Sequence, residues 1–310
     1  MSTIFRRTAA VRTADGAVLH AVVDGPDLDR DGRAAATLVL AHGWTLAQAA
    51  WDDVAALLAP RIAAGELRLI RYDQRGHGRS MWGATDPVSI DRLGEDLGTL
   101  VDELAPEGPA VLAGHSMGGM TIMCLAAARP ELFGDRIRGV ALVSTSAGDL
   151  QPEPRTRAGR LRQRLTPGAL AAALAGARAI ERLRHLVPPE HPRHRKIVRG
   201  LLYGADATDE MVLAGAEIMH ASTVRAFTAF LPALGEHDKR AELKALQQVP
   251  VEILVGDSDK LTPERHSRQL AEALPDARLQ VVPRTGHMLL QERPELVVDA
   301  LDRLLGEAGR

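Results

Sequence analysis

The stretch VLAGHSMGGM, residues 111–120, places Ser116 at the centre of a Gly-x-Ser-x-Gly pattern. The apolar run 110–113 predicts a short buried strand, and residues 117–128 predict the helix that follows it. A serine on a sharp turn between a strand and a helix holds its hydroxyl clear of the sheet. The two glycines leave room for that turn, and the N–H of Met117 at the helix start can face a negatively charged oxygen. The stretch therefore predicts an elbow that presents Ser116 as a nucleophile.

Apolar strands and amphipathic helices alternate along the chain on both sides of this elbow. Between 151 and 240 the pattern changes, because that segment lacks a buried strand and is helical in pattern and rich in Ala, Leu and Arg. Such alternation is typical of a mostly parallel sheet flanked by helices. The sequence predicts an α/β fold with a core of residues 1–150 and 241–310 and an inserted all-helical cap at 151–240. The predicted strands are 17–23, 37–41, 67–72, 110–113, 140–143, 251–255 and 279–282, and the predicted helices are 90–104, 117–128, 263–274 and 294–305.

Three motifs together resemble the α/β-hydrolase superfamily. Gly-His-Ser-Met-Gly-Gly at 114–119 looks like its nucleophile elbow, and Ala-His-Gly-Trp at 41–44 resembles its oxyanion loop. By that likeness the backbone N–H of Trp44 is one oxyanion donor and that of Met117 is the other. The stretch RYDQRGHGRS at 71–80 resembles a turn of the same family, which we interpret as structural. The resemblance covers about 40–150 and 240–305, and no motif of the cap belongs to it.

The resemblance also implies a base and an acid, since the family's chain order is serine, acid, histidine. His287 lies after a late strand and before the last helix, where the family has its catalytic histidine. Two acids follow the strand 251–255, and the pattern Gly-x-x-Asp before Thr-Pro selects Asp259 over Asp257. Asp257 stays open as an alternative with a turn role, whereas Asp149, which also follows a strand, has no supporting pattern.

The remaining histidines near these motifs have simpler interpretations. His115 adjoins the serine, but the geometry of the elbow is expected to point it away. His185, His191 and His194 lie among charges of the cap, where we expect solvated side chains. Cys124, the one cysteine, lies in an apolar stretch and is expected to be a small core residue, so the chain has no disulfide and no multi-cysteine zinc site.

A serine nucleophile with a histidine base predicts acyl transfer through an acyl-enzyme. We expect hydrolysis of a carboxylic ester without metal or cofactor. Gly-x-Gly-x-x-Gly after the first strand and His-Glu-x-x-His do not occur. Lactones, thioesters, carbon–carbon bonds and cofactor-free haloperoxidase or perhydrolase chemistry remain alternatives, as does a small-molecule receptor. Serine at the elbow argues against dehalogenases and epoxide hydrolases, which use aspartate there, and the cap holds a single tyrosine, Tyr203.

Composition limits the partners. Aromatic residues are 3% of the chain and the formal net charge is −2, which argues against nucleic-acid binding. No apolar run approaches the length of a membrane span, and the first residues do not resemble a signal peptide. We therefore expect a cytoplasmic protein that acts on a small ester or acyl substrate.

The cap is unusually basic over residues 155–199, with twelve Arg or Lys, two Glu and no Asp. A solvated helix face is the simpler interpretation. The alternative is weak contact with an anionic partner, such as a carboxylate substrate, an acyl carrier protein or anionic lipid. Candidates for an apolar acyl pocket or for plain cap core are Met211, Met219, Phe227 and Phe230, and an Ala-rich helix is expected to begin at Thr166-Pro167.

Overall fold

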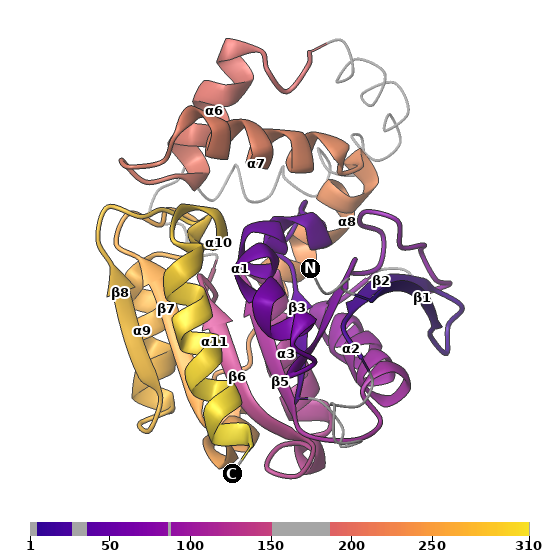
Figure 1. Ribbon diagram of the computed structural model, residues 1–310. Coiled ribbons are helices and arrows are strands. Elements are labelled where there is room, and N and C mark those ends of the chain that lie inside the picture. Colours follow the sequence, from indigo (N-terminus) through magenta and orange to yellow (C-terminus); the bar gives the residue numbers. More distant parts are fainter. Residues whose placement is uncertain (1–4, 27–35, 86–87, 151–186, 310) are drawn as a thin grey trace.

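The computed structural model describes residues 5–26, 36–85, 88–150 and 187–309. Its centre is an eight-stranded sheet with the strand order β1-β2-β4-β3-β5-β6-β7-β8 (Figure 1). β1 and β2 run antiparallel at one edge, β2 is antiparallel to β4, and all other neighbours are parallel. The predicted α/β fold with a mostly parallel sheet is confirmed. The strands are β1 (Arg6–Arg12), β2 (Val18–Asp24), β3 (Ala36–Ala41), β4 (Leu67–Tyr72), β5 (Ala110–His115), β6 (Ile137–Val143), β7 (Val251–Gly256) and β8 (Arg278–Val282).

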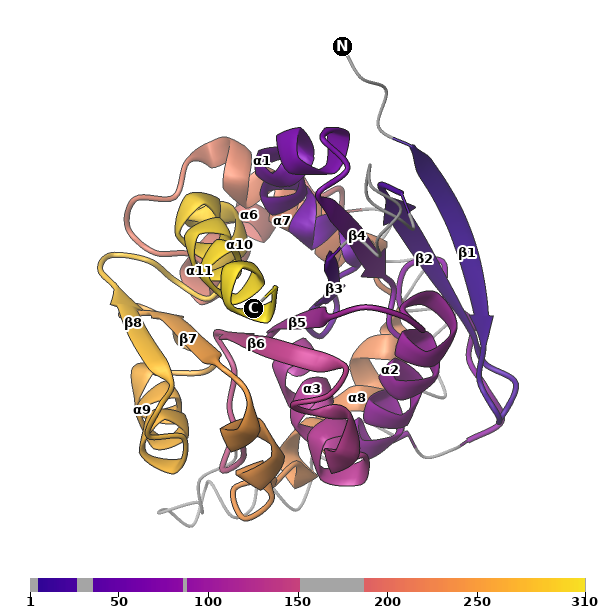
Figure 2. The same cartoon turned by 60° about the horizontal axis from the view of Figure 1, so that its bottom comes forward.

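Helices cover both faces of the sheet. Figure 2 shows α1 and α11 on one face and α2, α3 and α9 on the other. Short 3-10 turns lie at Gln48–Trp51, Pro130–Leu132 and Leu243–Gln248. The helices are α1 (Asp52–Ala63), α2 (Ile90–Leu104), α3 (Met117–Ala128), α6 (Pro192–Leu202), α7 (Asp209–Ala221), α8 (Val224–Glu236), α9 (Glu264–Ala273), α10 (Leu289–Glu292) and α11 (Pro294–Ala308).

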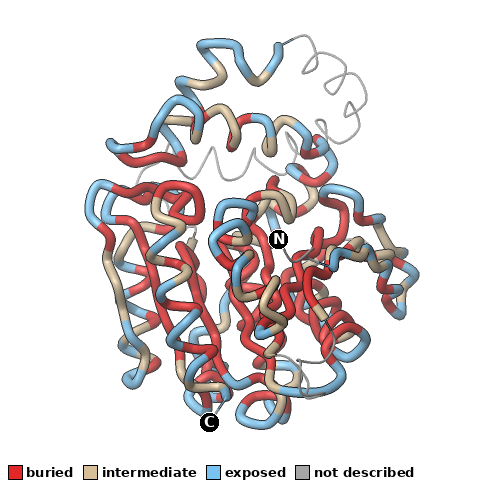
Figure 3. Tube along the Cα trace, viewed as in Figure 1, coloured by how far each residue is buried: buried red, intermediate tan, exposed pale blue. Residues whose placement is uncertain are grey.

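Side chains of the central strands enter two separate cores. Leu112 of β5 packs with α2 and α3, whereas Val111 and Ala113 point to the opposite face and pack with α1 and α11. This division explains why the strand sequences are apolar without alternation, since neither face meets water. Figure 3 shows the resulting buried strands at the centre of the molecule, with exposed residues mainly on the outer helices.

Among the elements that were not predicted from the sequence are β1 and α1. β1 is an edge strand in which exposed and half-buried residues alternate, and its three arginines hide it from a search for apolar runs. α1 contains Pro60, which argues against a helix when the sequence is read by itself. The predicted helix 90–104 has the same bounds in the structure, where the hydroxyl of Ser89 caps it by accepting a hydrogen bond from the N–H of Arg92 at 3.1 Å.

Helices α6, α7 and α8, called the cap below, lie across one end of the sheet (Figure 1). Between residues 187 and 240 the structure contains helices and loops and no strand, as predicted. α7 and α8 begin at Thr208 and Thr223, whose hydroxyls accept hydrogen bonds from the helix N-termini. The predictions for Arg157, Arg160, Arg162, Arg164, His185 and the helix start at Thr166-Pro167 fall outside the described residues. The boundaries at 150 and 241 stay predictions.

No helix in the described parts of the chain has both the length and the apolar character needed to cross a membrane.

Candidate active site

Ser116 lies between the end of β5 and the start of α3 with a left-handed backbone, φ 53° and ψ −118°. Close contacts around it require glycine. A Cβ atom on Gly114 would lie 2.4 Å from the carbonyl carbon of Gly118, and one on Gly118 would lie 2.2 Å from the carbonyl oxygen of Ala41. The N–H of Ser116 donates to the carbonyl of Val143 at 2.9 Å, which ties the turn to β6. These contacts stabilise a strained backbone conformation of Ser116, which would relax without them.

The side chain of Ser116 is half-buried, whereas both of its neighbours are fully buried. The Nε2 of His115 donates to the carbonyl oxygen of His287 at 2.8 Å, and the centroids of the two rings lie 4.8 Å apart. Burial, together with the nearby His287 ring, lowers the pKa of His115 to about 3. A neutral His115 therefore joins the elbow to the loop that carries His287.

His287 and Asp259 are hydrogen-bonded, with 2.8 Å between Nδ1 and Oδ2, and both are buried. The other carboxylate oxygen of Asp259 accepts the N–H groups of Leu261 and Thr262, each at 2.9 Å. Burial by itself would raise the pKa of Asp259, but His287 and the donors of Thr262 outweigh it, so this pKa lies below its usual value. Asp259 is thus an ionised partner that fixes the orientation of the His287 ring.

The two alternative acids lie elsewhere. Asp257 is exposed and bonds to the hydroxyl of its neighbour Ser258 at 2.8 Å, in agreement with a turn role. Asp149 is exposed in the loop after β6 and has a positive φ of 60°. Neither is a hydrogen-bond partner of His287 in the structure.

The loop after β3 lies against the elbow at Gly43. A Cβ atom there would come within 3.2 Å of the Ser116 Cβ and 2.9 Å of the His115 Nδ1. Met117 is the first residue of α3, so its N–H precedes the hydrogen-bonded turns of that helix. The loop at Gly43 and the start of α3 thus both lie beside Ser116.

Gln74 holds this loop in place. Its N–H donates to His42 Nε2 at 2.9 Å, its side-chain amide donates to the carbonyl of His42 at 2.6 Å, and its side-chain oxygen accepts from the Thr121 hydroxyl at 2.8 Å. Burial lowers the pKa of His42 to about 4, so the ring is neutral and its Nε2 accepts. The 71–80 stretch is structural, as interpreted: Arg75 is fully buried and its guanidinium bonds to Asp15 and Asp96.

Trp44 connects the same loop to the cap. Its indole N–H donates to the carbonyl of Ala226 at 3.3 Å, and its ring stacks on Phe227 with 4.6 Å between centroids. Both partners belong to α8. The side chain of Trp44 is therefore in contact with α8, while its backbone belongs to the loop that lies beside Ser116.

The loop that carries His287 is hydrogen-bonded to the last residue of α6 and to the residues that follow it. The N–H groups of His287 and Met288 both donate to the carbonyl of Leu202, at 2.7 and 3.1 Å. The buried carboxylate of Glu292 accepts the N–H of Gly204 at 2.8 Å and that of Gly286 at 2.9 Å, so one side chain bridges the two segments. Burial raises the pKa of Glu292 above its usual value. Glu292 was not predicted from the sequence, where its signal is an acid at the end of an apolar turn before Pro294.

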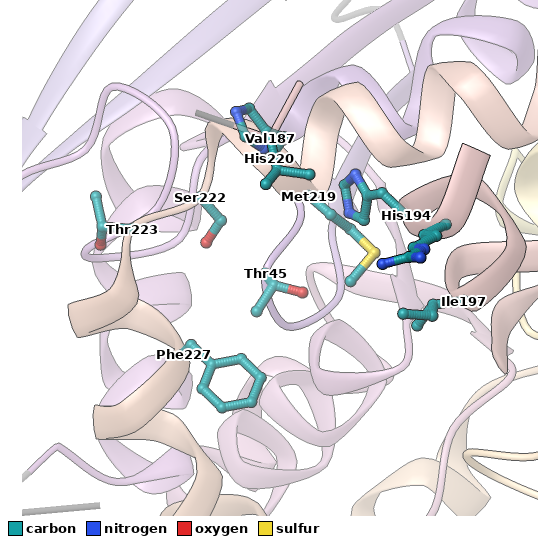
Figure 4. A pocket seen from close by; sticks show the side chains of 10 residues that line it. Thr45, Val187, His194, Ile197, Met219, His220, Ser222, Thr223 and Phe227 are labelled. Atoms are coloured by element: carbon teal, nitrogen blue, oxygen red, sulfur yellow. The ribbon is translucent and has the colours of Figure 1, made fainter. Parts of the chain in front are cut away.

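A pocket of about 530 Å³ opens between the cap and the core (Figure 4). Met219 and Phe227 line it, as the acyl-pocket hypothesis requires, whereas Met211 and Phe230 do not and Phe230 is core. The prediction of a solvated His194 is wrong, because that side chain is half-buried and lines the pocket. Among the described residues, the lining is Thr45, Val187, Arg193, His194, Ile197, Met219, His220, Ser222, Thr223 and Phe227.

Cys124 is buried in the core as expected, with its sulfur 3.8 Å from the Nδ1 of His237. Burial raises the pKa of its thiol, so it is not a thiolate at neutral pH. Among the described residues, no cluster of three or more His, Cys, Asp or Glu side chains is arranged to hold a metal ion.

Comparison with known proteins gives consistent matches. Residues 38–300 match the model of the alpha/beta hydrolase family. The chain is 30% identical to RutD of Caulobacter sp. (strain K31), over 96% of this chain and 98% of that protein. It is 28% identical to the pimeloyl-[acyl-carrier protein] methyl ester esterase of Nitrosomonas europaea, over 86% of this chain and 94% of that one. Among solved structures it resembles the enol-lactonase of Burkholderia xenovorans LB400, with a TM-score of 0.71, 27% identity and coverage of 97% and 100%.

Proposed function

The chain belongs to the alpha/beta hydrolase family, and on that basis we propose that it is a serine hydrolase that cleaves a carboxylic ester with Ser116, His287 and Asp259 as its triad. The hydrogen bond of 2.8 Å between His287 and Asp259 supports this proposal most directly. It fixes the Nδ1–H tautomer of His287, which leaves Nε2 free to accept a proton. Esterases and an enol-lactonase among the similar proteins support hydrolysis as the reaction class.

In the acylation step, Ser116 Oγ attacks the ester carbonyl carbon while His287 Nε2 takes the hydroxyl proton. Asp259 stabilises the imidazolium that forms. The C–O bond to the alcohol then breaks, and the alcohol leaves with the proton from His287. Water repeats the sequence on the acyl-enzyme, and the acid product leaves.

The negative charge that develops on the carbonyl oxygen needs donors in fixed positions. We assign this role to the backbone N–H groups of Trp44 and Met117. The Gln74 hydrogen bonds to His42 support the assignment, because they hold the loop before Trp44 rigidly. Two fixed donors need little rearrangement during the reaction. This preorganisation is the main reason why they stabilise the transition state.

The substrate class rests on chemistry that esters and lactones share, since a lactone is a cyclic ester. A thioester differs only in its leaving atom. The first choice is therefore a carboxylic ester with an acyl or alcohol part small enough for a pocket of about 530 Å³.

The proposal is tested by turnover of p-nitrophenyl esters of increasing acyl length by the wild-type protein and by Ser116→Ala. Turnover should fall by about 10⁴-fold or more in Ser116→Ala. Ser258→Ala removes an exposed serine next to Asp259 and should retain turnover. Ester cleavage that survives in Ser116→Ala would overturn the proposal.

A further inference from the structure

The pocket between cap and core has an unusual combination of side chains. Its apolar walls come from Val187, Ile197, Met219 and Phe227. Its polar lining contains hydroxyls and the basic side chains of Arg193, His194 and His220, and none of the lining residues that the structure describes is an acid. An apolar ligand would need only the first set of side chains. The second set adds positive charge and hydrogen-bond donors.

Within the part of the chain that the structure describes, two polar atoms of this lining have no hydrogen-bond partner. The hydroxyl of Ser222 has none although the residue is only 5% exposed, and the Nδ1 of His194 is likewise buried and without a partner. An unsatisfied buried polar atom costs about 1–3 kcal/mol, so native structures seldom leave one without a reason. Figure 4 shows Ser222, His194 and Thr45 around the same space. An acceptor oxygen of a ligand would satisfy the Ser222 hydroxyl and, in the tautomer that carries a proton there, the Nδ1 of His194.

Arg193 adds a charge at the exposed rim. Among the described residues, no acid lies within ion-pair distance of its guanidinium, whereas Arg195 and Arg199 of the same helix pair with Asp209. The planar guanidinium fits a carboxylate in a two-point hydrogen bond. The local charge of the pocket is therefore positive and unneutralised at this rim.

The pocket is linked to the elbow through Thr45 and Phe227. Thr45 follows Trp44 directly, and Phe227 stacks on the Trp44 ring. The backbone of the same loop lies against Ser116 at Gly43. A ligand in this pocket thus lies on the cap side of the loop that we assign as oxyanion donor.

We propose that this pocket binds a carboxylate carried on the apolar part of the substrate, so that the protein prefers esters whose non-reacting end is an anionic carboxylate. Arg193, Ser222 and His194 bind the carboxylate oxygens, and Ile197, Met219 and Phe227 pack on the aliphatic chain. The identification of this ligand as a substrate rests on the proposed esterase function. The carboxylate-binding site itself does not depend on turnover.

Calorimetric titration tests the site directly, using Ser116→Ala protein so that catalysis plays no part. Hexanoate, hexanol and hexylamine share one apolar chain and differ in charge. Hexanoate should bind at least about tenfold more tightly than hexanol, and hexylamine should bind least, because a carboxylate gains charge-assisted hydrogen bonds. Equal affinities for hexanoate and hexanol would overturn the proposal.

Variants in the same background identify the residues. Arg193→Gln and Ser222→Ala should each weaken hexanoate about threefold or more and leave hexanol unchanged. Lys196→Gln removes one positive charge from the exposed side of α6, outside the pocket, and should change neither affinity. If Lys196→Gln weakens the binding of hexanoate as much as Arg193→Gln does, the affinity depends only on the overall charge of the cap, and the proposed carboxylate site is wrong.

Turnover separates this proposal from the proposed function. In the wild-type protein, hexanoate should inhibit p-nitrophenyl ester hydrolysis competitively, and Arg193→Gln should raise its inhibition constant about threefold or more. Ester hydrolysis without preferential hexanoate binding would refute the carboxylate site and leave the esterase intact. Selective hexanoate binding without any ester hydrolysis would refute the esterase and support the site.

Discussion

The backbone on the Ser116 side of the site is held by hydrogen bonds from the sheet and its flanking segments, whereas the loop of His287 is hydrogen-bonded to the end of α6 and the segment after it. On the first side, Val143 and Gln74 fix the elbow and the adjoining loop. On the second side, Leu202 accepts two N–H groups of the base loop, and Glu292 bridges both segments. Nucleophile and base are therefore held mainly by different parts of the chain, and the hydrogen bond from His115 to the carbonyl of His287 links them.

This difference separates two kinds of perturbation. A change at the elbow should act on the nucleophile and on the stability of the core. A change in the segment 202–206 should reach the base through the backbone of His287 while the elbow stays intact. The cap is thus part of the support of the base as well as a cover for the pocket.

The largest expected effect is on the base side, at the acid. Asp259→Asn should lower kcat for p-nitrophenyl acetate by about 10⁴-fold, because an amide favours the wrong tautomer of His287. Asp257→Asn is the matched control and should stay within about threefold, since Asp257 is exposed and bonds only locally. Equal losses in both variants would contradict the assignment of Asp259.

Acid should weaken the nucleophile side. Burial lowers the pKa of His42 to about 4, and burial with the neighbouring His42 lowers that of His77 to about 3. Below about pH 6.5 the unfolded chain binds protons that these folded rings do not, so the stability that they contribute above that pH is lost as the pH falls. Urea unfolding should show a free energy of unfolding lower by at least about 2 kcal/mol at about pH 5 than at about pH 7. A free energy that rises or stays constant on acidification would contradict the neutral, buried rings.

Glu292 tests the link between the base and the cap. Glu292→Ala leaves the N–H groups of Gly204 and Gly286 without their acceptor, which should cost about 1–3 kcal/mol of stability for each group. We expect kcat/KM to fall about tenfold or more, because the His287 loop loses its support. Glu292→Gln keeps one acceptor oxygen, so its stability and its kcat/KM should lie between those of the wild-type protein and those of Glu292→Ala.

Glu295→Ala is the control for Glu292, since Glu295 is exposed in the first turn of α11 and should change neither quantity. The measurements are urea unfolding and steady-state kinetics on the same preparations. Lost stability with unchanged kcat/KM would mean that Glu292 supports the fold and not the base.

The smallest effect is expected from an exposed ion pair that joins the same two segments. The Nη2 of Arg284 lies 2.5 Å from the Oδ1 of Asp206, and the side chain of Arg284 is 65% exposed. Exposed pairs contribute about 0–1 kcal/mol, so Arg284→Gln should shift the midpoint of urea unfolding only slightly and leave kcat/KM within about twofold. A loss as large as that of Glu292→Ala would show that the surface pair, and not the buried carboxylate, couples cap and base.

Sequence patterns predicted the elements around the elbow because the relevant information is local. Gly114, Ser116 and Gly118 lie within five residues, and the steric reason for each glycine can be stated before the structure is known. His287 was predicted because it follows a late strand, where the family that the chain resembles has its catalytic histidine. The choice between Asp257 and Asp259 needed a family pattern, since both follow the same strand, and only the structure shows that Asp259 is buried and bonded to His287 while Asp257 is exposed.

The residues that were missed have partners far away in the chain. Glu292 and Gly204 are separated by 88 positions, and Gln74 and His42 by 32. Such pairs are invisible to periodicity, which reports only which face of an element is apolar. The pocket could not be predicted for the same reason, because Thr45 and Ser222 are far apart in the sequence and line one space only when the cap packs on the core.

The most direct test of the central claim is the site of covalent labelling. The wild-type protein is treated with a fluorophosphonate probe, digested, and mapped by mass spectrometry, beside Ser116→Ala and His287→Ala. The account predicts a single adduct on Ser116, none in Ser116→Ala and much slower labelling in His287→Ala. Labelling of a different serine, or of none in the wild-type protein, would contradict the claim that Ser116 is the nucleophile.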